Sequence, residues 1–382
     1  MNRREFVRRL AAAGLGAAGV AGGGSALQQP SRPVDDEVLY NGIRLGRPWP
    51  PRRSSIARRP EMPPYLMDPP DVIPIDVGRQ LFVDDFLIET TTLERRYHSA
   101  EYHPASPILR PTTPWEKRDE YADRTGTHSN PVAMVFSDGV FYDPADRVFK
   151  MWYMGGLAQH TCLAISQDGI HWEKPSLDDK GTNIVWSGLR DSSTVWLDYA
   201  ERNPDLRYKM AVYNGSEHCL QLYTSPDGIR WLAGRKSGYT GDRTTFFYNP
   251  FRRRWVYSIR DEIPAQNLRR RRYWESTSFT DVGWERDEPT LWVAADELDP
   301  KRPGYNVTPE LYNLDCVAYE SILLGLFTIW RGELTTREKP NDLVAGYSRD
   351  GFHWYRPERR PFIGVSEHEG DWNWGNVQSA GG

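Results

Sequence analysis

Two aspartates, Asp191 and Asp242, occupy equivalent positions in successive copies of an internal repeat. Each lies seven residues before the residue that opens a hairpin turn, Asp198 or Asn249. Two carboxyl groups at one point can do acid–base chemistry, because one can donate a proton while the other activates water or attacks carbon. The alternative is that these acids cap backbone N–H groups or lie in solvated loops. The architecture of the repeat therefore decides whether the two groups can act together.

The repeat is a tract of the form Ser-x-Asp-Gly-x-x-Trp. It occurs at 166–172, 225–231 and 348–354, with a degenerate copy at 278–284. Asp-Gly supplies the positive φ angles of a tight hairpin turn, and the Trp can cover that turn and fill the gap to the next unit. A second hairpin precedes each tract, so each unit contains four strands. The mean spacing of about 61 residues between the Trp residues suits such a unit.

These units predict an all-β fold, a five-bladed β-propeller with four-stranded antiparallel blades and an incomplete last blade. A β-sandwich is the alternative, but sandwiches rarely repeat one signature at a fixed interval. The tail resembles the opening of a further inner strand, which predicts a C-terminally truncated chain that lacks roughly 50 residues. The expected blades are 127–175, 190–234, 240–287, 308–357 and a partial blade at 370–382, with a closing strand at 80–89 that pairs with the last blade.

Composition excludes several function classes. The 382 residues include 48 Lys plus Arg against 52 Asp plus Glu, so no overall positive field exists to attract nucleic acid or anionic lipid. The basic run Arg269–Arg272 accordingly predicts an exposed loop. The three cysteines are widely spaced and the eight histidines show no metal-binding spacing, so we expect neither a disulfide framework, nor a catalytic metal, nor a cofactor. A single structural ion on the axis stays open as an alternative.

The first 26 residues resemble a twin-arginine signal, because Arg3-Arg4 precede a weakly hydrophobic run rich in Ala and Gly. The resemblance implies a periplasmic or secreted bacterial protein without stable membrane insertion. The alternative is a basic helix on a cytosolic protein. Residues 27–74 are rich in Pro and Arg, which predicts a linker or a surface wrap. The propeller is then expected over 75–382.

The blades, the Asp-Pro hairpin at 143–144 and the entry segments 108–111 and 114–116 together resemble five-bladed propeller glycosidases related to glycoside hydrolase families 32, 43, 62 and 68. The resemblance covers about residues 75–382. It implies hydrolysis of O-glycosidic bonds in an oligo- or polysaccharide by acids that meet in a funnel at the axis. The alternatives are a glycoside phosphorylase, for which Arg243 and Arg260 could bind phosphate, and a non-catalytic carbohydrate-binding propeller. The oligomeric state is not predicted.

Within this resemblance, Asp191, Asp242 and Glu310 are the predicted catalytic acids. Glu310 is the predicted proton donor, because it opens the fourth inner strand between aromatic residues, and Asp315 is its rival. Arg260-Asp261 is similar to the Arg-Asp-Pro motif of family 32, although its place in the strand predicts that it lies at the wrong end for the axis. Structural packing or hydrogen bonding is the alternative for all residues of the binding set. The predicted substrate-binding residues are Asp85, His128, Arg243, Arg260, Trp372, Trp374 and Asn376.

Overall fold

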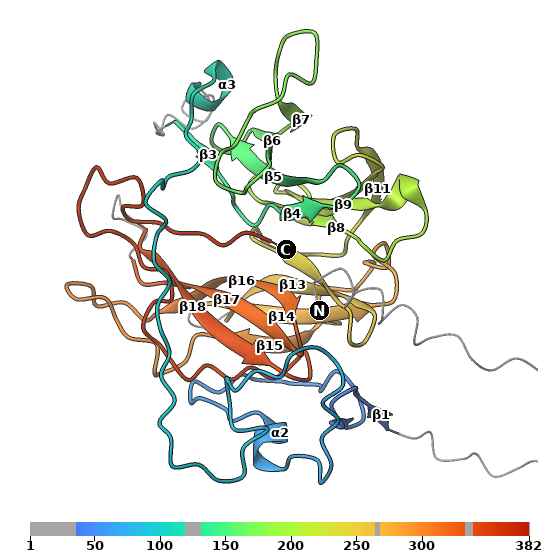
Figure 1. The fold of residues 1–382 in the computed structure, drawn as a ribbon, viewed down its shortest axis with the longest axis vertical. Helices are drawn as coiled ribbons and strands as arrows, with labels where there is room; N and C mark the ends of the chain where they lie inside the picture. Colours follow the sequence, from blue (N-terminus) through green and yellow to red (C-terminus); the bar gives the residue numbers. More distant parts are fainter. Residues whose placement is uncertain (1–35, 119–130, 264–267, 333–338, 382) are drawn as a thin grey trace, which may run out of the picture.

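The computed structural model of the chain describes residues 36–118, 131–263, 268–332 and 339–381. Its regular secondary structure is almost entirely β, with four larger antiparallel sheets in a β-propeller arrangement (Figure 1) and a separate two-stranded sheet near the N-terminal end of the described chain. The all-β propeller expected from the repeat is therefore confirmed. The predicted number of blades is wrong, because the described residues form four blade sheets and not five.

The sheets follow the chain in order. Only the second and third have the predicted four strands, while the first has five and the fourth has three. The first sheet contains β3 (Ala133–Met134), β4 (Val140–Asp143), β5 (Val148–Gly155), β6 (His160–Ser166) and β7 (Ile184–Ser187). The second contains β8 (Ser193–Leu197), β9 (Tyr208–Asn214), β10 (Cys219–Ser225) and β11 (Leu232–Lys236). The third contains β12 (Thr245–Asn249), β13 (Arg254–Ile263), β14 (Leu268–Ser276) and β15 (Thr290–Ala294), and the fourth contains β16 (Glu310–Tyr319), β17 (Ile322–Trp330) and β18 (Asn341–Ser348).

The inner strands β4, β8, β12 and β16 contact one another in succession. Residues 377–381 lie between the fourth sheet and the first. The Val377 N–H donates to the Asn341 carbonyl at 3.2 Å, and Gly381 forms a parallel bridge with Gly139. The predicted partial blade at 370–382 is thus wrong for its described residues, because they make isolated bridges and no sheet.

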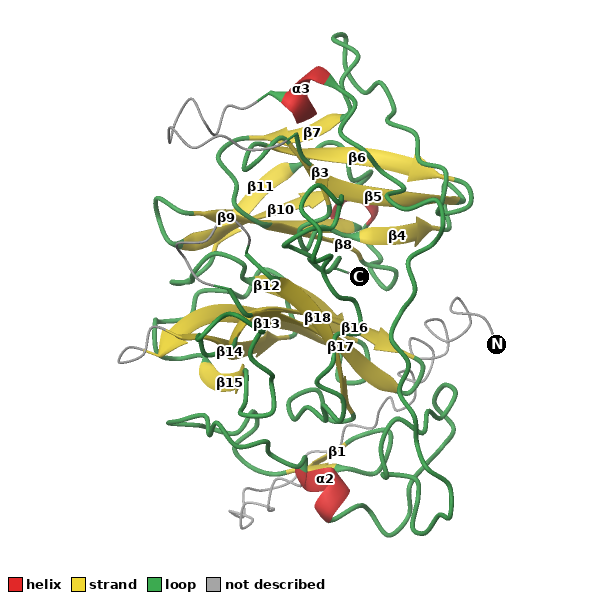
Figure 2. Ribbon diagram, turned by 90° about the vertical axis from the view of Figure 1, so that its left-hand side faces the viewer, coloured by secondary structure: helices red, strands yellow, loops and turns green. Residues whose placement is uncertain are grey.

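The predicted closing strand at 80–89 is also wrong, since this segment contains no strand. Side chains hold it instead of a ladder of backbone bonds. The buried carboxylate of Asp84 pairs with Arg349, in the Asp-Gly turn that follows β18, at 2.7 Å. The surrounding N-terminal segment contains β1 (Glu37–Val38), β2 (Arg44–Leu45) and α2 (Pro64–Met67), and it lies at the opposite end of the molecule from β7 and α3 (Pro114–Lys117) (Figure 2).

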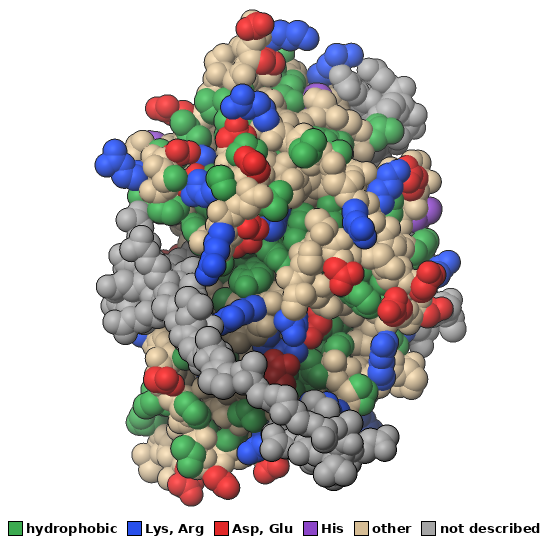
Figure 3. Space-filling view, turned by 90° about the vertical axis from the view of Figure 1, so that its right-hand side faces the viewer, with side chains coloured by type: hydrophobic (Ala, Val, Ile, Leu, Met, Phe, Trp, Pro, Cys, Tyr) green, Lys and Arg blue, Asp and Glu red, His purple; other side chains and the backbone are tan. Residues whose placement is uncertain are grey.

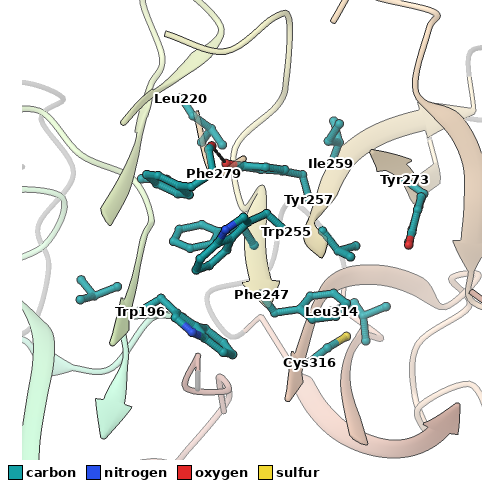
Figure 4. Packing of buried hydrophobic residues seen from close by; sticks show 14 of the residues in the cluster. Trp196, Leu220, Phe247, Trp255, Tyr257, Ile259, Tyr273, Phe279, Leu314 and Cys316 are labelled. Carbon is teal, nitrogen blue, oxygen red and sulfur yellow. Dashed lines mark hydrogen bonds between the residues drawn. The ribbon is translucent and has the colours of Figure 1, made fainter. Parts of the chain in front are cut away.

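Aromatic rings fill the space between the sheets, as their abundance predicts. Figure 4 shows Trp196 of the second sheet near Trp255 of the third, with ring centroids 6.3 Å apart. Beside them, the hydroxyl of Tyr257 donates to the Phe279 carbonyl. The three cysteines are free, buried thiols. In the described residues, no helix is long and apolar enough to cross a membrane.

The Asp-Gly tracts form turns between strands, as the repeat predicts, but in the tract of the second sheet only Gly228 has a positive φ, and the connection from Ser225 to Leu232 is longer than a tight hairpin turn. In the second sheet, the hydroxyl of Ser225 accepts the Gly228 N–H at 2.9 Å, and Asp227 accepts the N–H groups of Ile229 and Arg230, each at 2.9 Å. The Gly228 carbonyl then accepts the indole N–H of Trp152, from the first sheet, at 2.8 Å. The turn of the second blade therefore binds a tryptophan side chain of the first blade.

Gly228→Ala is expected to lower the free energy of unfolding by about 1–3 kcal/mol more than Gly169→Ala does. Both glycines have a positive φ, +77° and +79°, so the backbone strain is the same. A methyl group at 228 would lie 2.5 Å from the Trp152 ring, whereas at 169 the nearest atom, on Phe149, is 4.0 Å away. Urea unfolding of both variants measures the difference, and equal losses would contradict the role given to Trp152.

Candidate active site

The residues that the repeat aligns lie side by side at one end of the inner strands. Arg243, which precedes β12, donates from Nη1 to the Phe136 carbonyl at 3.1 Å and from its main-chain N–H to Ser192 Oγ at 3.1 Å. Asn313 of β16 donates to Ser137 Oγ at 2.8 Å. All four sheets therefore contribute to one cluster of polar side chains, which we call the axial cluster.

Asp191 and Asp242 both lie in the axial cluster, just before β8 and β12. Asp191 is partly exposed, yet its Oδ2 is buried and has no hydrogen-bond partner. Burial, followed by the neighbouring charge of Asp242, raises the pKa of Asp191 to about 6, against the opposing effect of Arg243. Asp191 is thus a carboxyl group that keeps its proton in weakly acidic solution, beside a second carboxyl group.

Arg260 reaches Asp242 from β13, with Nε 3.0 Å from Oδ1. This ion pair lacks hydrogen-bond geometry, so the buried Oδ1 stays without a donor. The expectation that Arg260-Asp261 lies at the wrong end of its strand is therefore wrong for Arg260. Asp261 points the other way, to Arg270 and Arg272 at 2.8 and 2.9 Å, because successive side chains of a strand face opposite sides.

Glu310, at the start of β16, is held by Arg269. The main-chain N–H and Nη1 of Arg269 both donate to Glu310 Oε2, at 2.9 and 3.0 Å. Two residues along β16, burial together with the charges of Asp191 and Asp242 raises the pKa of Tyr312 to about 12. Glu310 thus lies near the aspartate pair, but as the acceptor of two hydrogen bonds.

Asp315, the rival of Glu310, is enclosed by donors. It accepts from Ser137 Oγ at 2.8 Å, from Asn313 Nδ2 at 2.8 Å and from Ser379 Oγ at 2.5 Å. Burial raises its pKa, and Arg243 acts against this shift. Because its neighbours come from the first and fourth sheets and the C-terminal segment, Asp315 joins elements of the ring.

The prediction that Arg269–Arg272 forms an exposed loop is wrong, because these residues lie in β14. Arg271 is fully buried and donates to the carbonyls of Arg243, at 2.7 Å, and Tyr312. Burial, together with the charges of Arg243 and Arg260, lowers its pKa to about 9. The repeat could have predicted this strand, because a four-stranded third blade needs a strand at residues 269–272.

Arg243 was a predicted substrate-binding residue, but its guanidinium is fully buried and binds the protein itself. Besides the Phe136 carbonyl, it donates from Nη2 to Ser137 Oγ at 2.9 Å and to Gln378 Oε1 at 3.0 Å. Its φ of +57° is uncommon for a residue with a side chain, so the surroundings hold this conformation. Arg243 therefore positions its neighbours in the axial cluster.

One buried ion pair of the site was not predicted from the sequence. Arg190 and Asp138 bond through two contacts of 3.1 and 3.2 Å, and neither side chain is exposed. Arg190 also lowers the pKa of Asp191. Neither residue carries the repeat signature, so only the folded arrangement reveals the pair.

The other predicted binding residues lie elsewhere or at the edge of the axial cluster. Asp85 pairs with Arg95 at 2.5 Å in the N-terminal segment. Trp372 is 55% exposed, with its ring edge-on to Tyr102 at 5.1 Å. Trp374 forms a bridge with Ser366 in the same surface region, and His128 lies outside the described residues.

Asn376 is linked to the axial cluster by hydrogen bonds. Its Oδ1 accepts from Gln378 Nε2 at 2.7 Å, and Gln378 in turn binds Arg243. Of the predicted set, the structure therefore brings together Asp191, Asp242, Glu310, Arg243, Arg260 and, at the edge, Asn376.

Within the described ranges, no group of three or more His, Cys, Asp or Glu side chains could hold a metal ion. Figure 3 shows one face of the molecule, on which Lys and Arg alternate with Asp and Glu without a large patch of either sign. The axial cluster itself contains carboxyl, guanidinium and phenol groups.

No protein-family model and no curated protein matches the chain. Among solved structures, a thermostable family-43 glycoside hydrolase matches with a TM-score of 0.43 and 11% identity, over 63% of this chain and 78% of that one. An N-acetylgalactosamine deacetylase from F. plautii matches at 0.41 and 12%, over 62% and 76%. An endo-arabinase from Bacteroides thetaiotaomicron matches at 0.40 and 12%, over 60% and 81%. These likenesses concern the fold and assign no activity.

Proposed function

We propose that this protein is a glycoside hydrolase that cleaves O-glycosidic bonds at the aspartate pair of the axial cluster. The observation that supports the proposal is the close approach of Asp191 and Asp242, whose surroundings differ. Asp191 has a raised pKa of about 6 and a buried, unpartnered oxygen, while Asp242 lies against the guanidinium of Arg260. Glycosidic cleavage needs such a division of labour between two carboxyl groups.

In this proposal, Asp191 protonates the leaving oxygen of the glycosidic bond. Asp242, as a carboxylate held by Arg260, activates water or attacks the anomeric carbon. Asp191 takes the role that the sequence suggested for Glu310, because Glu310 accepts two hydrogen bonds from Arg269 and so makes the bonds of a carboxylate. Arg190 and Arg243 keep the pKa of Asp191 from rising further, and Tyr312 lies within reach of both aspartates.

The test is turnover of a panel of aryl glycosides and polysaccharides, with and without inorganic phosphate. Release of reducing sugar without phosphate supports the proposal. Turnover that requires phosphate would instead indicate a phosphorylase, and binding without turnover would indicate a carbohydrate-binding propeller. The phosphate-binding role suggested for Arg243 and Arg260 has little support, because the first is bound inside the protein and the second pairs with Asp242 and Glu262.

The value of kcat/KM is expected to fall as the pH rises through about 6. An acid with a raised pKa is protonated below that value, so the proton that Asp191 must donate is lost above it. Asp191→Asn is expected to remove this falling limb. It should also slow hydrolysis of a methyl glycoside by about 10²- to 10⁴-fold, while sparing a dinitrophenyl glycoside, whose leaving group needs no proton.

Glu310→Gln is the matched comparison for the same two substrates. If Glu310→Gln shows the strong dependence on the leaving group and Asp191→Asn does not, the donor is Glu310 and our assignment of Asp191 is wrong.

A further inference from the structure

Arg331, directly after β17, has a buried guanidinium with an unused edge. Its side chain is 4% exposed, and Nη1 donates to Asp342. Nε and Nη2 are both buried and have no hydrogen-bond partner. In the described part of the chain, no other buried arginine leaves both of these donors unpaired.

The same edge holds a carboxylate elsewhere in this protein. Arg252 donates from Nε and Nη2 to the two oxygens of Glu37, both at 2.9 Å. Arg349 binds Asp84 in the same way, at 2.8 and 2.7 Å. The two parallel N–H groups match a pair of oxygens on one atom, as in a carboxylate or a sulfate. The unpaired Nε and Nη2 groups of Arg331, which we call the fork, can therefore bind an acidic group in the same way.

Arg331 follows β17, the strand that pairs with β16. Trp330, the residue before Arg331, is the cross-strand partner of Glu310. The guanidinium of Arg269, which binds Glu310, lies 4.4 Å from the centre of the Trp330 ring and 5.5 Å from that of Tyr312. Glu310, Trp330 and Asn341 are cross-strand neighbours on one face of the fourth sheet, whereas Arg331 lies with Asp342 on the other face.

Further unpaired polar atoms gather at the same end of the fourth sheet. The indole N–H of Trp330, Nε of Arg269 and Oδ1 of Asn341 are all buried without a partner. Donors outnumber acceptors among these atoms. A buried donor without a partner is unfavourable, so this arrangement favours a ligand that is rich in acceptor oxygens.

The balance of charge also favours an acid. Asp342 already pairs with Nη1 of Arg331, and Glu310 pairs with Arg269. Neither acid contacts Nε or Nη2 of Arg331. Deeper in the axial cluster, Arg271 has no carboxylate partner, and burial together with the neighbouring arginines lowers its pKa. An added negative charge would relieve this repulsion.

We propose that the Nε and Nη2 edge of Arg331 binds the carboxylate or sulfate of an acidic sugar unit at this end of the fourth sheet. This inference rests on the proposed glycoside hydrolase function and narrows its substrate to acidic glycans. A uronic acid and a sulfate ester share the chemistry that the fork recognises, and the experiment separates them.

The experiment is titration calorimetry on the full chain with sugars that differ only in the acidic group. The probes are galacturonate, galactose 6-sulfate and galactose, then glucuronate and glucose. Wild type is expected to bind one acidic sugar about tenfold or more tightly than its neutral partner. Arg331→Lys keeps the charge but lacks the fork, and it should lose this preference. Preference for galacturonate or glucuronate assigns a carboxylate, and preference for galactose 6-sulfate assigns a sulfate.

Arg360→Gln is the control, because Arg360 is 75% exposed and binds only Glu358 in the contacts described. It should keep the preference of wild type. Equal binding of acidic and neutral sugars by wild type, or an unchanged preference in an Arg331→Lys variant that unfolds at the same temperature, would overturn the proposal.

The two proposals fail separately. Hydrolysis of neutral glycosides without any preference for acidic sugars would contradict the proposed anion site but support the proposed hydrolase function. Selective binding of acidic sugars without hydrolysis of any acidic or neutral glycoside would support the proposed anion site but contradict the proposed hydrolase function.

Discussion

Asp242→Asn lowers kcat by about 10²- to 10⁴-fold, since the amide can neither activate water nor attack carbon. Unlike Asp191→Asn, this variant is expected to slow the hydrolysis of methyl and dinitrophenyl glycosides alike. The step assigned to Asp242, activation of water or attack on carbon, does not depend on protonation of the leaving group. The loss should appear in kcat with little change in binding, as Asn keeps the size of Asp. Steady-state kinetics with both substrates, and calorimetry with the product sugar, measure these effects.

A second readout follows from the charge of Asp242. This charge raises the pKa of Asp191, so its removal should move the falling limb of the residual activity to lower pH. Asp287→Asn is the control, because Asp287 is 86% exposed and pairs only with Arg272 in the described contacts. A kcat for Asp242→Asn within about threefold of that of Asp287→Asn would contradict acid–base catalysis by Asp242.

Arg243→Met is expected to lower the free energy of unfolding by about 3–5 kcal/mol. The change removes the donors of three acceptors, the Phe136 carbonyl, Ser137 Oγ and Gln378 Oε1, inside the protein. It also removes the positive charge that opposes the raised pKa of Asp191. Urea unfolding measures the loss of stability, and the pH profile of any remaining activity should show the falling limb at higher pH.

Arg253→Met is the matched control for this variant. Arg253 also has a left-handed backbone, with a φ of 53°, but its side chain is exposed. The control therefore carries the same backbone strain without the buried hydrogen bonds, and it should unfold like wild type. Similar losses in both variants would show that strain, and not the guanidinium, sets the stability at Arg243.

The repeat made the fold predictable. The Asp-Gly turns and their Trp residues depend on local geometry and on contacts between neighbouring blades, and both leave a periodic signature. The number of blades could not be predicted in the same way. Residues 370–381 resemble an inner strand in sequence, yet in the described chain they form only isolated bridges, and only 377–381 lie between the fourth sheet and the first. Whether such a segment gains strand partners depends on the rest of the ring.

The axial cluster was predictable only in part. Asp191 and Asp242 follow from the register of the repeat, because the inner strands carry equivalent residues to equivalent places. Arg190 and Asp138, in contrast, pair between two connecting segments, one before β8 and one before β4, and no pattern within the chain marks such a pair. Arg271 was misread because a run of charges usually lies in solvent, and here tertiary burial overrides that tendency.

Arg271 joins the third and fourth sheets through the main-chain carbonyls of Arg243 and Tyr312. Every amino acid offers that same oxygen, so this joint places no demand on the identity of the side chain at 312. A designer could exchange the ring at that position for another group and leave the seam between the sheets closed. The side chain at 312 and the contact between the sheets can thus be altered independently at this point.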